Sequence, residues 1–306
     1  MKKIDFHVHI TDSIPLEKTA EHFRALCERK GYEGVCMLAY VHESSVHHLT
    51  CNEDALALKA MLPGSYAFAA LHHDRDFVVQ AREYMERGFD GIKILEGKPS
   101  VYRYLGYGLD HSRYDAFFAY AEKEQIPIIL HNNDPAGNWD INKATPRAIE
   151  KGWYYDETMP THEWFFETLE GVLARHSRLR VALAHFGFYA DDLDRAERLM
   201  EACPNLYMDL TPALDIFWTF SKNAPRTEAF FRKYHARIFY GTDAQNDLTG
   251  FAREYNDAKT HTIDTFLGGG APCVIRDHVI APISLTDEML ENIYYHTAMR
   301  FIKNKT

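Results

Sequence analysis

The sequence has few cysteines, and they are not spaced as a framework. Five occur in 306 residues, an odd number with no CxxC pair: Cys27, Cys36, Cys51, Cys203 and Cys273. A disulfide-stabilised fold and a thiolate zinc site are therefore disfavoured, because both need paired or closely spaced cysteines. We expect these side chains to serve packing.

The chain also lacks a long hydrophobic run and an excess of basic residues. No apolar stretch approaches the roughly 20 residues of a membrane-spanning helix. The start, MKKIDFHVHI, has Asp5 and His7 where a signal peptide needs a continuous apolar region. The formal net charge is −10 and the isoelectric point is near 5.9, which gives no basic footprint for nucleic acid or anionic lipid. We expect a cytoplasmic protein that acts on a small molecule and binds neither nucleic acid nor membrane.

What the sequence does contain is a regular alternation of strand-like and helix-like segments. Eight short runs rich in apolar and β-branched residues recur at 3–10, 34–41, 66–73, 91–95, 126–132, 179–186, 206–210 and 237–243. Most are followed by apolar residues at helical spacing, as in 15–31, 74–88 and 113–125. Eight such units favour a closed α/β fold, the (β/α)₈ TIM barrel, as a single domain over residues 1–306. A doubly wound open sheet would need a Gly-rich turn after its first strand, and HVHITDSIP has none.

Two connections of the predicted barrel are long. Residues 132–160 follow the fifth strand and residues 244–285 follow the eighth, and we expect both to be irregular loops. Trp139, Trp153 and Tyr155 favour a packed lid over disorder in the first of them. Residues 286–303 are predicted to form a helix that begins at a threonine N-cap and closes the barrel.

Residues of metal-ligand type end four of the predicted strands. His7 and His9 are two residues apart, so they project from the same face of the first strand. His131, His185 and Asp243 end the fifth, sixth and eighth strands, and in a parallel barrel these ends open on one face. Three imidazoles and a carboxylate suit a zinc ion that keeps one position open for water. The pattern therefore predicts a catalytic metal site at the mouth of the barrel.

The same motifs carry a family resemblance. DFHVH, ILH at 129–131, LAH at 183–185, GTD at 241–243 and the final NIYYHTAMRFI resemble the amidohydrolase superfamily. Within it, the chain is most similar to the amidohydrolase-related (amidohydrolase 2) group that includes the aminocarboxymuconate-semialdehyde and resorcylate decarboxylases. The resemblance covers essentially the whole chain. It implies that His7, His9, His131 and Asp243 hold one divalent ion, Zn²⁺ or alternatively Mn²⁺, and that His185 polarises the substrate or activates water.

Lys93 lies on the predicted fourth strand, and three roles for it stay open. In binuclear members of the superfamily a carboxylated lysine on this strand holds a second metal, so the resemblance allows that role. Alternatively, Lys93 pairs with a substrate carboxylate or with an acid of the protein. The third role is structural, and it also needs a partner because a charged lysine is almost never buried unpaired. Lys98 and Arg103, just beyond, could serve a carboxylate substrate equally well.

Three further residues follow strands of the predicted barrel. His72, after the third strand, and Asn132, next to His131, are candidates for binding substrate, although each also fits an ordinary surface or turn position. Asp209 ends the seventh strand and is predicted to hydrogen-bond a ligand histidine.

The site favours a metal-dependent hydrolase of a small, carboxylate-bearing molecule such as a lactone, an amide or a related acid derivative. Metal-activated water would be the nucleophile, with Asp243 as proton shuttle. A non-oxidative decarboxylase of an aromatic or unsaturated carboxylic acid uses the same ligands and stays open. A TatD-like phosphoesterase is disfavoured because it has a glutamate where this chain has Lys93, and a scaffold protein is disfavoured because no ligand position is lost. Aromatic residues in the long connections could support a homodimer.

Overall fold

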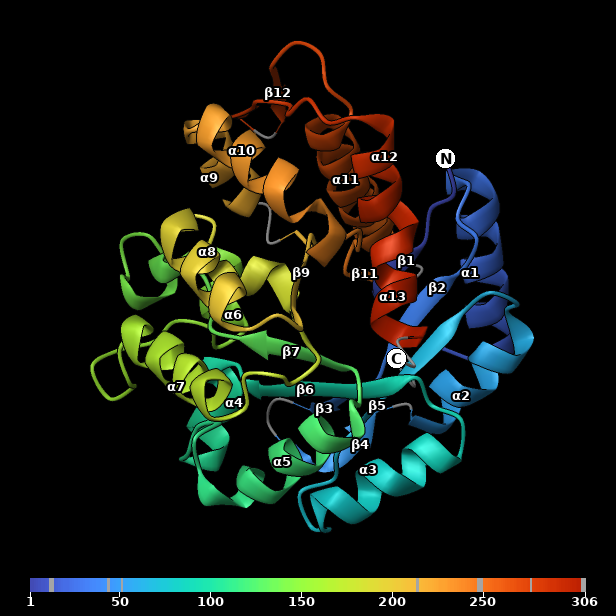
Figure 1. The fold of residues 1–306 in the computed structure, drawn as a ribbon, viewed down its shortest axis with the longest axis vertical. Helices are drawn as coiled ribbons and strands as arrows, with labels where there is room; N and C mark the ends of the chain where they lie inside the picture. Colours follow the sequence, from blue (N-terminus) through green and yellow to red (C-terminus); the bar gives the residue numbers. More distant parts are fainter. Residues whose placement is uncertain are drawn as a thin grey trace.

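Parallel strands curl into a barrel in the computed structural model, which describes residues 1–10, 14–42, 45–50, 52–212, 215–246, 250–275 and 277–303. For 40–42, 45–50 and 250–253 only the backbone is described. All eight predicted strands are present: β1 (Asp5–His9), β2 (Val35–Leu38), β5 (Tyr66–Ala70), β6 (Gly91–Gly97), β7 (Ile128–Asn132), β8 (Val181–Leu183), β9 (Leu206–Asp209) and β10 (Ile238–Phe239). Figure 1 labels most of them. The prediction of eight strands is confirmed.

The eighth strand closes the barrel. The sheet order is β10-β9-β8-β7-β6-β5-β2-β1-β11, where β11 (Ala244–Gln245) follows β10 in the chain and pairs with β1. Between β10 and β11, the Phe6 N–H donates to the Tyr240 carbonyl at 3.1 Å and the Asp243 N–H donates to the His7 carbonyl at 2.8 Å. The two ends of the sheet are therefore joined, and the fold is the predicted (β/α)₈ TIM barrel.

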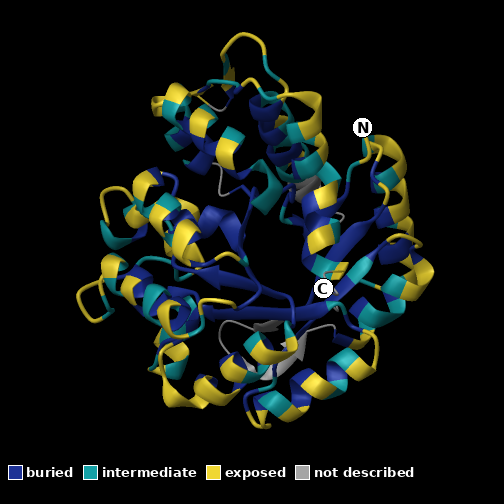
Figure 2. Cartoon of the chain, viewed as in Figure 1, coloured by how far each residue is buried: buried dark blue, intermediate teal, exposed yellow. Residues whose placement is uncertain are grey.

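Helices cover the outside of the barrel, and buried and exposed residues alternate along most of them (Figure 2). Their buried faces carry the apolar side chains that pack in the core. The helices are α1 (Leu16–Lys30), α2 (Asn52–Met61), α3 (Phe77–Glu86), α4 (Pro99–Leu105), α5 (Asp115–Glu124), α7 (His162–Arg175), α8 (Leu193–Ala202), α9 (Asp215–Lys222) and α10 (Ala224–Tyr234), with short 3₁₀ turns at Ser112–Tyr114 and His235–Arg237 and an irregular turn with left-handed residues at Ala184–Phe188. Several begin at a side-chain cap: Asp76, Thr161, Asp192 and Asn223 each accept a backbone N–H of the first turn.

Aromatic side chains fill the amino-terminal end of the barrel interior. Phe6, Phe68 and Phe239 point in from three strands and meet Phe301 of α13 (Thr297–Lys303), whose ring centroid lies 6.1, 6.3 and 5.5 Å from theirs. All four side chains are fully buried. The helix starts as α12 (Asp287–Glu291), capped by the Thr286 hydroxyl, and passes through a π-helical turn (Asn292–His296) into α13. The predicted cap and the closing role of this helix are confirmed. A functional site can therefore lie only at the other end of the barrel, where the strands end.

The two long connections contain more regular structure than predicted. Residues 132–160 form a 3₁₀ turn (Ala136–Trp139) and α6 (Pro146–Glu150), and 244–285 contain α11 (Gly250–Leu267) and the hairpin of β12 (Cys273–Ile275) and β13 (His278–Ile280). The expectation of irregular loops was wrong for the second segment, because α11 packs few apolar residues and its helical spacing is weak in sequence. The segments meet where Arg147 lies 5.4 Å from the centre of the Tyr255 ring.

Smaller expectations have mixed outcomes. The strand predicted at 34–41 is β2 followed by the first part of an antiparallel hairpin, β3 (Tyr40–His42) and β4 (Ser45–Thr50). The four cysteines within the described residues are free, and Cys51 lies outside them. In the part of the chain that the structure describes, no helix has the length and apolar character that crossing a membrane requires.

Candidate metal centre

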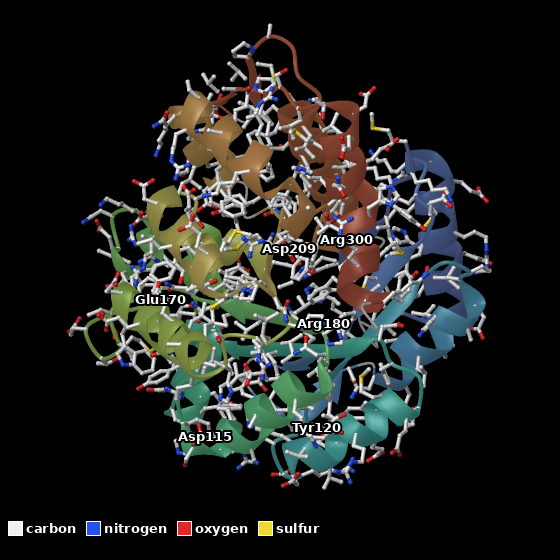
Figure 3. The ribbon with its side chains drawn as sticks, in the orientation of Figure 1. Asp115, Tyr120, Glu170, Arg180, Asp209 and Arg300 are labelled. Atoms are coloured by element: carbon white, nitrogen blue, oxygen red, sulfur yellow. The ribbon has the colours of Figure 1, made fainter. Side chains whose placement is uncertain are left out.

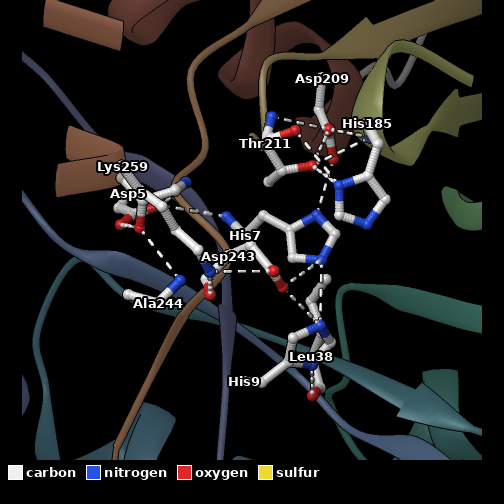
Figure 4. Close-up of polar contacts among 11 residues, drawn as sticks. Asp5, His7, His9, Leu38, His185, Asp209, Thr211, Asp243, Ala244 and Lys259 are labelled. Carbon is white, nitrogen blue, oxygen red and sulfur yellow. Dashed lines mark hydrogen bonds and ion pairs between the residues drawn. The ribbon is translucent and has the colours of Figure 1, made fainter. Parts of the chain in front are cut away.

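Three predicted ligands converge at the carboxyl ends of the strands. The Nε2 atoms of His7 and His9 are 3.2 Å apart, and Oδ1 of Asp243 lies 3.3 Å from Nε2 of His9 and 3.9 Å from Nε2 of His7. His7 is fully buried, and the other two side chains are partly accessible from the barrel mouth. Figure 4 shows the two rings and the carboxylate directed at one another. Elements more than 230 residues apart in sequence thus meet at one point, as the barrel topology predicted.

The opposite nitrogen of each ring is held by a hydrogen-bond acceptor. His7 donates from Nδ1 to Oδ2 of Asp209 at 2.7 Å, and His9 donates from Nδ1 to the Leu38 carbonyl at 3.2 Å. A neutral imidazole carries one N–H, so both Nε2 atoms present lone pairs toward Asp243. Three acceptors facing one another without a proton between them repel unless a cation lies among them. The residues present therefore fit a divalent metal ion.

Asp209, which is labelled in Figure 3, is fully buried and anchors two sides of this centre. While Oδ2 binds His7, Oδ1 accepts from the backbone N–H groups of His185 and Thr211 at 2.8 and 3.1 Å. Burial raises the pKa of this carboxyl, and the neighbouring His185, Thr211 and Lys93 oppose that rise. The predicted hydrogen bond between Asp209 and a histidine of the candidate site is confirmed by its contact with His7.

His185 lies beside the three converging groups. Its Nδ1 lies 3.2 Å from the Thr211 carbonyl, which can only accept, so Nε2 carries the lone pair. Its ring centroid is 5.9 Å from that of His7 and 4.8 Å from that of His131. Burial lowers the pKa of both His7 and His185 well below the usual value, so both rings are neutral at physiological pH.

Several residues at this end of the barrel have left-handed backbone conformations. Asn133, His185, Phe186 and Asp243 have φ angles of 66, 55, 57 and 54° although none is glycine. Such conformations are sparsely populated and persist only where surrounding contacts hold them. The chain therefore holds these strand ends in defined positions, which suits a site that needs fixed side-chain directions.

The amidohydrolase family model matches residues 4–303. The chain belongs to the amidohydrolase family. The resemblance seen in its motifs is thereby confirmed, and the family is one of metal-dependent enzymes. No curated protein matches the chain.

Solved structures share the amidohydrolase barrel. An uncharacterised TIM-barrel protein from Bordetella bronchiseptica has 16% identity and a TM-score of 0.61, with 98% of each chain covered. A probable 2-pyrone-4,6-dicarboxylic acid hydrolase from Acinetobacter baumannii with citric acid bound has 10% identity and a TM-score of 0.55, with 99% of each chain covered. A dihydroxybenzoic acid decarboxylase from a Polaromonas species, with bound manganese and 2-nitroresorcinol, has 15% identity and a TM-score of 0.55 and covers 99% of this chain and 97% of its own. At these identities the likeness shows the fold alone.

The fourth ligand that the resemblance implies, His131, lies next to the centre of this amidohydrolase but outside the converging group. Its Nε2 contacts the Asn133 carbonyl at 3.0 Å and lies 3.5 Å from Oδ1 of Asp134. The ring stands against that of His185. Its role as a ligand stays a prediction.

Lys93 points into the barrel below the centre. Its strand neighbours Ile92 and Ile94 pack in the outer core between sheet and helices, so alternation directs Lys93 inward. The residue is 2% exposed, and its Nζ has no hydrogen-bond partner among the described residues. Burial lowers its pKa to about 8, against the opposing influence of Asp209 and Asp243. A buried amine without a hydrogen-bond partner is costly.

A second lysine in the amidohydrolase centre was missed by the sequence reasoning. Lys259 of α11 donates from Nζ to the Asp243 carbonyl at 2.7 Å and to Oδ2 of its carboxylate at 3.1 Å (Figure 4). Burial tends to raise the pKa of the Asp243 carboxyl, but Lys259 and His9 outweigh it and hold this pKa well below its usual range. The only signal available was a helical spacing inside a segment that we expected to be a loop.

The two candidate substrate-binding residues point elsewhere. Nδ1 of His72 accepts the backbone N–H of Asp74 at 3.2 Å, and the side chain is partly exposed. Nδ2 of Asn132 donates to the Phe165 carbonyl of α7 at 3.3 Å, which directs the amide away from the barrel interior. The structure does not bring either side chain to the converging group, and their roles stay predictions.

Proposed function

We propose that this amidohydrolase is a metal-dependent hydrolase of a small, carboxylate-bearing molecule, such as a lactone, an amide or a related acid derivative. In this proposal residues 1–306 act as one catalytic domain. The observation that supports it most is the convergence of two imidazole nitrogens and one carboxylate oxygen at an accessible strand end. A homodimer and a cytoplasmic location stay predictions.

The proposed ion is one Zn²⁺ per chain. Imidazole and carboxylate ligands suit zinc and also accept Mn²⁺, the metal in the Polaromonas decarboxylase structure. His7, His9 and Asp243 would hold the ion, and His131 would join them after turning from the Asn133 carbonyl. One ion is favoured because, among the described histidine, cysteine and acidic side chains, a single group lies close enough to share a metal. When bound, the ion would lower the pKa of a water to about 7 and polarise a carbonyl oxygen.

In this proposal two side chains move protons. Oδ2 of Asp243 is bonded by Lys259, so Oδ1 is the oxygen that would accept the proton of the attacking water and return it to the leaving group. Nε2 of neutral His185 carries a lone pair and can also accept a proton. Once protonated, His185 becomes a donor to the oxyanion that develops on the attacked carbonyl.

The ammonium of Lys93, which has no hydrogen-bond partner among the described residues, supports a substrate that carries a carboxylate. An anion beside Nζ would satisfy the buried amine and fix the orientation of the substrate below the attacked bond. The two other roles, a carboxylated lysine that holds a second ion and a purely structural lysine, remain alternatives. The second ion would double the metal content.

The alternative function is a non-oxidative decarboxylase of an aromatic or unsaturated carboxylic acid. It is supported by the shared barrel of the Polaromonas decarboxylase. Lys93 weighs against it if Lys93 binds the reacting carboxylate, because an ammonium stabilises the charged ground state more than a transition state that resembles CO₂. Lys93 is better suited to bind a substrate carboxylate that is not lost as CO₂ during the reaction.

Turnover assays on metal-free and metal-loaded protein test the proposal. The protein is stripped with a chelator, reloaded with Zn²⁺ or Mn²⁺, and incubated with carboxylate-bearing lactones and amides and, separately, with hydroxybenzoic acids. We expect hydrolysis, measured as acid release, only in the loaded protein. Release of CO₂ from the acids without hydrolysis of any lactone or amide would favour the alternative, and activity that survives complete metal removal would contradict both.

A further inference from the structure

The ammonium of Lys259 is buried against Asp243. The residue is 3% exposed and comes from α11, sixteen positions after Asp243 in the chain. Among the described residues, its hydrogen bonds both go to Asp243, one to the main-chain carbonyl and one to Oδ2. The ring of Tyr255, one helical turn earlier, lies 4.7 Å from Nζ and covers it. Asp243 is therefore the polar environment of this buried charge.

These contacts divide the two oxygens of the Asp243 carboxylate between different tasks. Oδ2 accepts from Lys259, whereas Oδ1 faces Nε2 of His9 and Nε2 of His7. An ammonium that holds the second oxygen opposes rotation of the carboxylate, because rotation weakens that charge-assisted hydrogen bond. The side chain is thus held with Oδ1, rather than both oxygens, toward the two histidines.

The backbone of Asp243 is fixed at both of its polar groups. Its N–H donates to the His7 carbonyl at 2.8 Å, and its carbonyl accepts from Lys259 at 2.7 Å. Between them the residue keeps a φ of 54°, a conformation that an aspartate leaves readily unless it is held. Loss of the lysine would remove the restraint on the carbonyl and on the carboxylate together.

We propose that Lys259 is a positioning residue for Asp243, which fixes the carboxylate as a one-oxygen metal ligand and as the proton carrier of the site. The inference rests on the proposed metal site. By this inference, a residue of α11, in the connection after the eighth strand, helps to set the geometry of the centre.

Metal binding by three variants tests this role. Lys259→Met removes the ammonium, and Lys259→Gln keeps a neutral donor. Lys259→Arg keeps the positive charge, and its forked guanidinium can reach the carbonyl oxygen and Oδ2 of Asp243. Lys30→Met is the matched control, because Lys30 also pairs with an aspartate of α11, Asp257 at 3.5 Å, but at the surface. Each metal-free protein is titrated with Co²⁺ and Zn²⁺, and the visible absorption of the Co²⁺ form reports the number of ligands. Kinetic constants are measured on the loaded proteins.

We expect Lys259→Met to bind Zn²⁺ about 10- to 100-fold more weakly. Its Co²⁺ absorption should be weaker, because a carboxylate free to bind through both oxygens raises the coordination number. The kcat should fall while KM changes less than about twofold, as expected for a group that acts through Asp243. Lys259→Arg should recover most of the affinity, and Lys30→Met should match the wild type.

A Lys259→Met protein with wild-type affinity and an unchanged Co²⁺ spectrum would overturn the inference. If that variant does not fold, the comparison of Lys259→Gln with Lys259→Arg decides, and equal affinity and spectra in those two would overturn it as well. If the wild-type protein binds neither Zn²⁺ nor Co²⁺, the proposed function itself fails. If the wild type and the Lys259 variants all bind the metals equally well, only the role of Lys259 fails.

Discussion

At the scale of single residues, the acceptors behind the histidines decide what the histidines can do. Asp209 and the Leu38 carbonyl hold the Nδ1 atoms of His7 and His9, and this directs both Nε2 atoms toward Asp243. The sequence predicted that His7, His9 and Asp243 lie together and that Asp209 bonds one of the histidines. It did not predict Lys259, because nothing in the local pattern of α11 distinguishes this lysine from an exposed one.

Replacing Asp209 by asparagine should weaken metal binding. An amide is a poorer acceptor for the His7 N–H and lowers the basicity of the opposite nitrogen, so we expect a 10- to 100-fold higher dissociation constant for Zn²⁺. Zinc titration of metal-free protein measures it. Asp90→Asn is the matched control, since Asp90 accepts the Ala67 N–H and pairs with Lys59 at the other end of the strands. Equal effects of the two substitutions would contradict a role of Asp209 in the metal site.

Replacing Asp243 by asparagine should abolish turnover while the barrel stays folded. The amide oxygen can still accept from Lys259, but the group no longer takes a proton, and losses of about 10²- to 10⁴-fold are typical of removing a general base. Steady-state kinetics and the far-UV circular dichroism spectrum measure the two effects. A folded variant with near wild-type turnover would contradict the proton-carrying role.

Lys93 should make the stability of the metal-free protein depend on pH. Burial lowers its pKa from 10.5 to about 8, so below pH 8 the folded state holds a buried charge that the unfolded chain hydrates. The unfolded state binds more protons between these values, so this penalty is relieved as the pH rises from 8 to 10.5. Lys93→Met should therefore raise the free energy of unfolding by about 3 kcal/mol at pH 7 and by less at pH 10. Urea unfolding at both pH values measures the gap, and a gap that does not shrink would refute this account of Lys93.

At the scale of elements, strands and most flanking helices could be predicted, whereas the long connections could not. The strands are apolar and short, and α1, α3 and α5 carry clear helical spacing. In contrast, α11 combines many polar residues with a few buried apolar ones, among them Ile263 and Phe266. Tertiary packing therefore determines which face of this helix is turned toward the core. The contact between Arg147 and Tyr255 also depends on two segments meeting over the barrel, which no local pattern encodes.

The packing of α13 against the amino-terminal end of the barrel can be tested by its effect on stability. Phe301 is fully buried against rings from several strands, including Tyr207 at 5.1 Å. Phe301→Ala should lower the free energy of unfolding by about 3–5 kcal/mol through lost contacts and a cavity. Lys303→Ala, at an exposed position of the same helix, should change it by less than about 0.5 kcal/mol. Urea denaturation of the two variants measures the free energy of unfolding. A decrease below about 1 kcal/mol for Phe301→Ala would argue against this packing role of Phe301.

At the scale of the whole molecule, the closed barrel makes distant residues into one site. His7 and Asp243 are brought together by the pairing of β1 with the eighth strand, which follows from topology alone. The position of His131 shows the limit of this reasoning, because the strand end is where topology puts it while the direction of the ring depends on Asn133 and Asp134. The substrate depends on connections whose conformation the sequence did not predict.

The central claim is that His7, His9 and Asp243 form a metal site, and the zinc content of purified protein tests it most directly. Metal-free wild type and a His9→Ala variant are dialysed against dilute Zn²⁺, and metal per chain is measured by mass spectrometry of the digested protein. We predict about one zinc ion per chain in the wild type and a small fraction of that in the variant. A wild type without zinc, or a variant that keeps its full zinc content, would contradict the claim.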